Sequence, residues 1–83
     1  MDAPLPSPNR VIDLRGEVCP YTLLKSKLAL EEMAVGQVLE VILDHRPAME
    51  DVPKGLRYEG QEVLLVEAIS ASEWKVIARK LRG

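Results

Sequence analysis

The segment 37–43, with the sequence Gln-Val-Leu-Glu-Val-Ile-Leu, constrains the fold of this chain more than any other feature. It is rich in β-branched residues and alternates with a period of two, which predicts a strand with one face in a core. The residues on that face are Leu39, Val41 and Leu43. Segments 62–70 and 74–81 have a similar character, and the short turn near residues 71–72 predicts that they form a hairpin. A weaker alternation over 11–15 predicts a first strand.

Two helices are predicted between these strands. The first runs from Pro20 to about residue 34, because proline suits the first helical position and Gly36 is placed to end the helix. At helical spacing, one arc of it is expected to face the core: Leu23, Ser26, Leu30, Met33 and Ala34. The second helix spans about 47–58, and Pro53 in its middle is expected to kink or shorten it.

The predicted order of elements is therefore βαβαββ. It indicates an α+β fold, a two-layer α/β sandwich in which two helices cover one face of a four-stranded mixed sheet. Residues 1–9 contain three prolines and no periodic apolar pattern, and we interpret them as a disordered leader. Residues 10–83 are long enough for one domain with one modest core.

Composition narrows the classes of function. The formal net charge of −2 argues against direct nucleic-acid binding, because phosphate recognition needs a basic stripe. No apolar run approaches the ~20 residues that span a bilayer, and no secretory signal is recognisable. Cys19 and His45 do not supply the three or four ligands of a metal site, so His45 is interpreted as a loop residue and neither metal nor cofactor is expected. The single cysteine forms no internal disulfide, which predicts a cytoplasmic protein with a reduced thiol.

The informative pair is Cys19-Pro20. If Pro20 is the first helical residue, Cys19 is the N-cap, and its sulfur lies beside the N–H groups that begin the helix. The helix dipole favours an anion there, and cysteines in such places commonly have a pKa below the free value of ~8.5. A group that is both nucleophile and leaving group in sulfur transfer suits this position. The alternative is that Cys19 is a small buried hydrophobic residue, and the residues alone leave both interpretations open.

The segment 13–20, Asp-Leu-Arg-Gly-Glu-Val-Cys-Pro, resembles the signature of the TusA/SirA-like sulfur-carrier family, in which Asp-Leu-Arg-Gly leads into Cys-Pro-x-Pro. The likeness extends over about residues 11–80 and includes Gly36, Asp44, Gly60 and the closing segment from Trp74. The resemblance implies a compact βαβαββ sandwich. It also implies that Cys19 carries sulfur as a persulfide between a cysteine desulfurase or rhodanese-like donor and a downstream acceptor.

Thr22 departs from the family motif, because it replaces the second proline. A proline there has no N–H, whereas Thr22 restores one, so the sulfur anion is expected to have two backbone donors, from Tyr21 and Thr22, rather than one. Hydrogen bonds to the anion lower the pKa of Cys19. The alternative is that Thr22 is merely tolerated at an exposed first turn.

Three further residues have two interpretations each. Arg15, four residues before Cys19, either adds positive charge near the sulfur or is a solvated strand-end arginine. Leu24 and Leu28 fall outside the predicted core arc and either form a docking ridge for a donor enzyme or are covered by the leader or by lysine stems.

The sequence thus predicts a sulfurtransferase or sulfur carrier that relays a persulfide on Cys19, with Pro20, Thr22 and Arg15 in support. Its expected partners are a protein sulfur donor and a protein acceptor, without membrane or direct nucleic-acid binding. The family serves tRNA thiolation, molybdenum-cofactor maturation and sulfur oxidation. The alternative function is a thiol-based regulatory or protein-interaction module without sulfur transfer.

Overall fold

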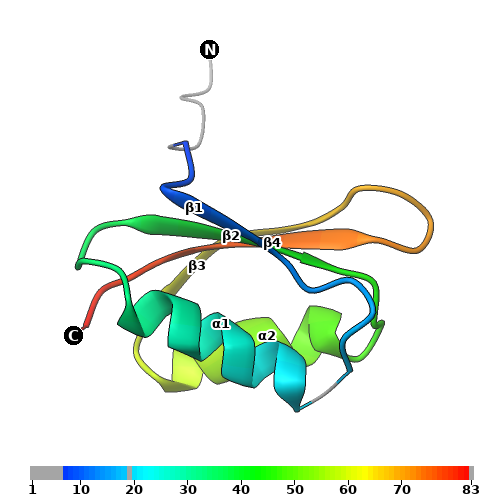
Figure 1. Ribbon diagram of the computed structural model, residues 1–83, viewed down its shortest axis with the longest axis horizontal. Helices are drawn as coiled ribbons and strands as arrows, with labels where there is room; N and C mark the ends of the chain where they lie inside the picture. The colour runs from blue at the N-terminus through cyan, green and yellow to red at the C-terminus, as the bar shows by residue number, and fades with distance from the viewer. Residues whose placement is uncertain (1–6, 19, 83) are drawn as a thin grey trace.

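The structure, a computed structural model, describes residues 7–18 and 20–82. Its elements follow the predicted order βαβαββ (Figure 1). The strands are β1 (Arg10–Asp13), β2 (Val38–Leu43), β3 (Glu62–Ala68) and β4 (Trp74–Arg79), and the helices are α1 (Tyr21–Glu31) and α2 (Ala48–Tyr58). The predicted α+β fold with a mixed sheet is confirmed.

The sheet has the strand order β1-β2-β4-β3. β1 and β2 are parallel, and β4 is antiparallel to both of its neighbours. The pairing of β3 with β4 confirms the predicted hairpin. Because β4 lies inside the sheet rather than at an edge, it carries a run of buried residues: Trp74, Val76, Ile77 and Ala78.

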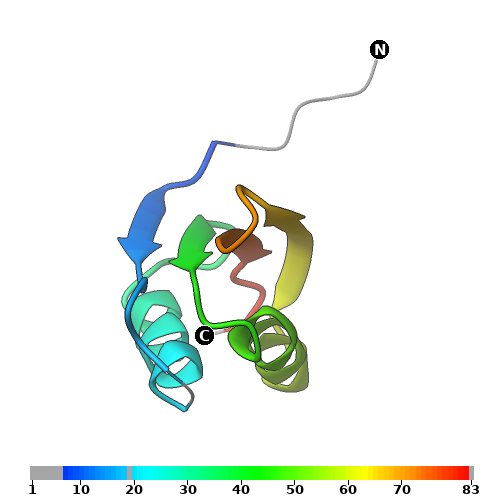
Figure 2. The same ribbon diagram turned by 90° about the vertical axis from the view of Figure 1, so that its right-hand side faces the viewer.

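Both helices cover the same face of the sheet, as Figure 2 shows. The core between the two layers is aliphatic, and the three inward residues of β2 are fully buried, as predicted: Leu39, Val41 and Leu43. The helices contribute Ala29 and Leu30 from α1, and Ala48, Val52 and Leu56 from α2. Each large aliphatic side chain buried in this way stabilises the fold by about 1.5–3 kcal/mol.

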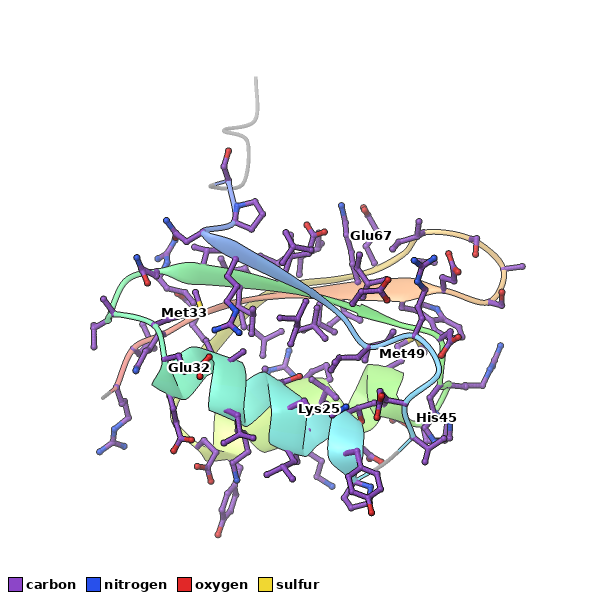
Figure 3. All side chains as sticks on the ribbon, in the orientation of Figure 1. Lys25, Glu32, Met33, His45, Met49 and Glu67 are labelled. Carbon is purple, nitrogen blue, oxygen red and sulfur yellow. The ribbon has the colours of Figure 1, made fainter. Side chains whose placement is uncertain are left out.

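The face of the sheet away from the helices carries cross-strand ion pairs. Arg79 Nη1 lies 3.3 Å from Glu62 Oε1, and Lys75 Nζ lies 3.5 Å from Glu67 Oε1. The members of each pair are direct neighbours in the β3–β4 register, and Glu67 points away from the helices in Figure 3. Between these pairs along β4, Ile77 is buried.

α1 differs from its prediction at both ends, since it begins at Tyr21 and ends at Glu31 rather than near residue 34. Gly36 does not end the helix. It has a φ of +93°, which favours glycine, and it lies in the turn before β2. Its N–H donates to the carbonyl of Lys80 at 2.7 Å, so this turn is tied to the end of β4.

The predicted core arc of α1 is partly wrong. Ala34 is exposed, whereas Thr22 and Ala29 are buried although the arc did not include them. The physical reason is that α1 packs against both the sheet and α2, which widens the buried side of the helix beyond a single arc. The arc is confirmed at three positions and holds in part at a fourth: Ser26, Leu30 and Met33 are buried, and Leu23 is partly buried.

Of the two effects expected of Pro53, a kink or a shortened helix, the shortening is wrong, because α2 runs from Ala48 through Pro53 to Tyr58. Proline removes one backbone donor from the helix. Pro53 is itself buried, and Val52 beside it is in the core, so burial of this side of α2 offsets the lost hydrogen bond.

Candidate functional site

The residues around Cys19 lie at the carboxyl ends of β1 and β2. Cys19 itself lies outside the described residues, so the site is built here from its neighbours. Because β1 and β2 are parallel, the loops that follow them leave the same edge of the sheet. The two loops are joined directly, since the backbone N–H of Gly16 donates to Asp44 Oδ1 at 2.9 Å.

The loop between β1 and α1 is held at further points. The N–H of Leu14 donates to the carbonyl of Ile42 at 2.8 Å, and the N–H of Glu17 donates to the carbonyl of Leu14 at 3.0 Å. Gly16 has a φ of +90° within this tight turn. Glu17 Oε2 lies 3.0 Å from Nζ of Lys25, a residue labelled in Figure 3, which ties the loop to α1. The loop is thus anchored to both layers of the molecule.

Arg15 is bound by two carboxylates. Its Nη2 lies 2.7 Å from Asp13 Oδ2, its Nε lies 2.9 Å from Asp13 Oδ1, and its Nη1 lies 3.3 Å from Glu73 Oε2. The side-chain hydrogen bonds from Arg15, followed by the bond from its backbone N–H, lower the pKa of Asp13 from 3.8 to about 2. The same contacts, led by Asp13, raise the pKa of Arg15. Its role near Cys19 stays a prediction, and its visible partners are carboxylates of β1 and of the β3–β4 loop.

Asp44 and Glu73 both contact the loop that leads to Cys19, although neither was predicted to have a role there. Asp44 had an available signal, because it directly follows β2 and the carboxyl ends of parallel strands meet at one edge of a sheet. No local sequence signal pointed to Glu73, because it lies 58 positions from Arg15 in the chain and meets it only in the folded structure.

The start of α1 differs from the predicted arrangement by one residue. Pro20, rather than Cys19, is the N-cap, with φ −90° and ψ 6°. The reason is a tight turn, in which the N–H of Tyr21 donates to the carbonyl of Val18 at 2.9 Å. The N–H of Leu24 donates to the carbonyl of Pro20 at 3.1 Å, with α-helical spacing. The N–H of Tyr21 is therefore engaged, and the expectation that it would serve a sulfur anion is wrong.

Thr22 is completely buried. The interpretation that it is merely tolerated at an exposed turn is therefore wrong. Its carbonyl accepts a hydrogen bond from Ser26 Oγ at 2.8 Å, one helical turn later. Thr22 is part of the packed side of α1.

A groove of about 490 Å³ opens between α1 and α2 and reaches Pro20. Leu23 of α1 and Gly55 of α2 line its centre. The helices approach so closely there that a Cβ on Gly55 would lie 2.5 Å from Leu23 Cδ2. Lys54 and Tyr58 border the groove on the α2 side.

His45 lies in the loop between β2 and α2, as predicted, and its carbonyl accepts the N–H of Ala48 at 3.0 Å. The next residue, Arg46, lies over the Trp74 ring at 5.7 Å from its centroid. Residues 7–18 and 20–82 contain no cluster of three or more His, Cys, Asp or Glu side chains able to hold a metal ion. Within the same residues, no helix is long and apolar enough to cross a membrane.

The sequence is similar to a known protein family and to individual members of it. The profile of the family described as Sulfurtransferase TusA matches residues 10–80. The chain is 51% identical over 72 residues to a protein of Archaeoglobus fulgidus, covering 87% of this chain and 82% of the relative. It is 40% identical over 67 residues to one of Thermotoga maritima, covering 81% and 85% respectively. Both relatives are named as candidate sulfur carrier proteins.

A solved structure has the same fold. The crystal structure of the SirA-like protein from Desulfitobacterium hafniense superposes with a TM-score of 0.77 and covers 88% of this chain and 99% of that chain. Its sequence is 23% identical, so this likeness concerns the fold alone.

Proposed function

Because the chain belongs to the TusA sulfurtransferase family, we propose that it is a sulfur carrier that holds a persulfide on Cys19. The observation that carries the proposal is the family match over residues 10–80, which contains the chain's single cysteine in the Cys-Pro step before α1. Relatives named as candidate sulfur carriers support the same role.

The proposed chemistry needs no external oxidant or reductant. The Cys19 thiolate attacks the terminal sulfur of a donor persulfide, a new S–S bond forms on Cys19, and the donor's S–S bond breaks to leave a donor thiolate. An acceptor thiolate then attacks the terminal sulfur on Cys19 in the same way. The start of α1 supports this step, because the helix dipole favours the thiolate and persulfide anions over their protonated forms. The anchored loop of residues 14–17 supports it by holding the approach to the helix.

We further propose that the donor is a cysteine desulfurase or a rhodanese-like protein, and that the acceptor serves tRNA thiolation, molybdenum-cofactor maturation or sulfur oxidation. A carrier thiol has to stay reduced between transfers, which favours the cytoplasm as its compartment. The domain that performs the reaction is proposed to span residues 10–83. Residues 1–6 of the disordered leader predicted over 1–9 lie outside the described residues. Within that leader, Asn9 exchanges two hydrogen bonds with Val38 of β2, both at 2.8 Å.

Mass spectrometry tests the proposal. Incubation with inorganic polysulfide, or with a cysteine desulfurase and L-cysteine, is expected to add ~32 Da at Cys19, and an added acceptor thiol is expected to remove it. The variant Cys19→Ala is expected to stay folded and to gain nothing. A wild-type protein that takes up oxygen but no transferable sulfur would instead be a thiol-based regulatory module.

A further inference from the structure

Exposed apolar residues run over the outer side of α1 from its first residue to Leu28. Four residues form what we call the outer stripe: Val18, Tyr21, Leu24 and Leu28. Each is about half exposed, between 49% and 55%. The last three recur at spacings of three and four, which places them on one side of α1, and Val18 lies just before the helix. The prediction that Leu24 and Leu28 lie outside the core is confirmed.

α2 lies in the same layer, but its exposed side is polar, as is usual for a surface helix. Its exposed positions are mostly charged: Glu50, Asp51, Lys54 and Arg57, followed by Tyr58. α2 is strongly amphipathic, whereas α1 is nearly as apolar on its outer side as on its buried side. A surface helix normally turns polar residues to solvent, and grouped exposed apolar residues mark interaction surfaces.

Two lysines beside the outer stripe are paired with carboxylates. Lys25 Nζ lies 3.0 Å from Glu17 Oε2, and Lys27 Nζ lies 3.7 Å from Glu59 Oε2. The margins of the stripe therefore present neutral pairs rather than a field of one sign. A partner that matches this surface needs an uncharged apolar patch, not a charged one.

The position of the stripe relative to Cys19 identifies the kind of partner. Sulfur passes only when the donor's sulfur reaches Cys19, so a protein donor has to cover the residues beside it. From Pro20 to Leu28, α1 rises about 12 Å at ~1.5 Å per residue. A standard interface buries about 800 Å² on each partner, equivalent to a disc of about 16 Å radius. The whole outer stripe thus falls within the footprint of a donor centred beside Pro20.

We propose that the outer stripe is the docking surface for the protein sulfur donor, which presents an uncharged apolar patch around its own persulfide cysteine. The inference rests on the proposed function of Cys19. Docking on Leu24 and Leu28 holds the two cysteines together during transfer, so the stripe governs loading by a protein and not loading by a small sulfur compound.

The experiment compares Leu24→Ser/Leu28→Ser with the wild type and with the matched control Val35→Ser/Leu81→Ser. Val35 and Leu81 are 61% and 49% exposed, and they lie beyond the C-terminal ends of α1 and β4, far from Pro20. Each protein is loaded from inorganic polysulfide, from a purified cysteine desulfurase with L-cysteine, and from a rhodanese with thiosulfate. The rate of sulfur gain on Cys19 is followed by mass spectrometry.

The stripe variant is expected to load about tenfold or more slowly from whichever protein donor loads the wild type, because loss of buried apolar anchors has effects of this size. Its polysulfide loading is expected to stay within about twofold of the wild type, and the control is expected to match the wild type with every donor.

Equal loading of the stripe variant and the wild type by a protein donor would overturn the docking proposal. So would a wild type that polysulfide loads but neither protein donor does, and this result would leave the carrier chemistry intact. Failure of polysulfide to load the wild type would instead overturn the proposed function. A large drop of the urea midpoint in the stripe variant, or loss of a wild-type dimer, would assign the stripe to this chain's core or to a second copy.

Discussion

Arg15 and Thr22 stand on opposite sides of Cys19 in the sequence, and each is more constrained than its residue type suggests. Arg15 is bound by Asp13 and Glu73, and Thr22 is fully buried. Substitutions of these residues or of their partners are therefore expected to change the stability of the fold or the pKa of Cys19. Two predictions at the scale of single residues follow from their contacts.

The first concerns the pH dependence of stability. The pKa of Asp13 is lowered to about 2 by Arg15, so the charged pair stabilises the fold above the unfolded value of 3.8. This contribution is lost as the pH falls from about 4 through about 2. We expect the difference in urea midpoint between the wild type and Asp13→Asn to be largest at pH 5 and to shrink toward pH 2. A difference that stays constant over this range would mean that Asp13 does not titrate with a lowered pKa.

The second concerns Thr22→Pro. Since Tyr21 already donates to Val18, the N–H of Thr22 is the remaining one of the two donors predicted for the sulfur anion. We expect Thr22→Pro to raise the pKa of Cys19 and to slow its alkylation near neutral pH, because hydrogen bonds to an anion lower its pKa. Thr22→Val keeps the N–H and a similar volume, and is expected to alkylate faster than Thr22→Pro. Iodoacetamide rates across pH measure the effect, and an unchanged or lower pKa in the proline variant would contradict it.

At the scale of elements, the contact between α1 and α2 depends on Gly55. The two helices run in the same direction (Figure 1), and the side chain of Leu23 occupies the space that a Cβ on this glycine would fill. Glycine in the middle of a helix costs about 1 kcal/mol relative to alanine. Its presence in α2 is explained by the space that Leu23 occupies.

We expect Gly55→Ala to lower the free energy of unfolding by about 1 kcal/mol, because the new Cβ overlaps Leu23 and overpacking outweighs the gain in helix propensity. In a Leu23→Ala background, the same change is expected to raise the free energy of unfolding by about 0.5–1 kcal/mol. Urea denaturation of the four proteins gives the coupling between the two sites. Equal effects in both backgrounds would show that the helices do not meet at this point.

The molecule has two distinct ends, because its two helices run parallel to each other. Both helices begin at the edge where β1 and β2 end, which is the edge that holds the site. Both helices finish at the opposite end, where Lys80 is buried and its Nζ donates to the carbonyl of Met33 at 2.7 Å. Met33 lies just past the C-cap of α1, where the helix dipole places partial negative charge, so a cation there stabilises the layer.

We therefore expect Lys80→Met to lower the free energy of unfolding by about 1–3 kcal/mol, because a buried carbonyl loses a charged partner. Lys75→Met in β4 removes a surface ion pair and is expected to change the free energy of unfolding by less than about 1 kcal/mol. Persulfide loading of both variants from polysulfide should match the wild type, since Lys80 lies at the opposite end of the molecule and the Lys75 side chain lies on the face of the sheet away from the helices. Comparable losses of stability in the two variants would show that the hydrogen bond from Lys80 to Met33 contributes no more to stability than a surface ion pair.

Much of the fold and part of the site follow from the sequence alone. The alternation of Leu39, Val41 and Leu43 determined which face of β2 is buried, because a strand exposes successive side chains on opposite faces. The helical spacing of Leu24 and Leu28 determined that they lie outside the core for the corresponding reason. Local residue chemistry also singled out Cys19-Pro20 at the start of the first helix.

The tertiary structure alone decided the features that depend on residues far apart in the chain. The place of β4 between β2 and β3 arises from pairing across the sheet, and the binding of Arg15 by Glu73 follows from that place. Thr22 is buried, and Pro53 is tolerated, because α1 and α2 pack on the sheet and on each other. Periodicity reports which side of an element is apolar. It does not report how many neighbours cover that side, because those neighbours are brought there by contacts that no local pattern contains.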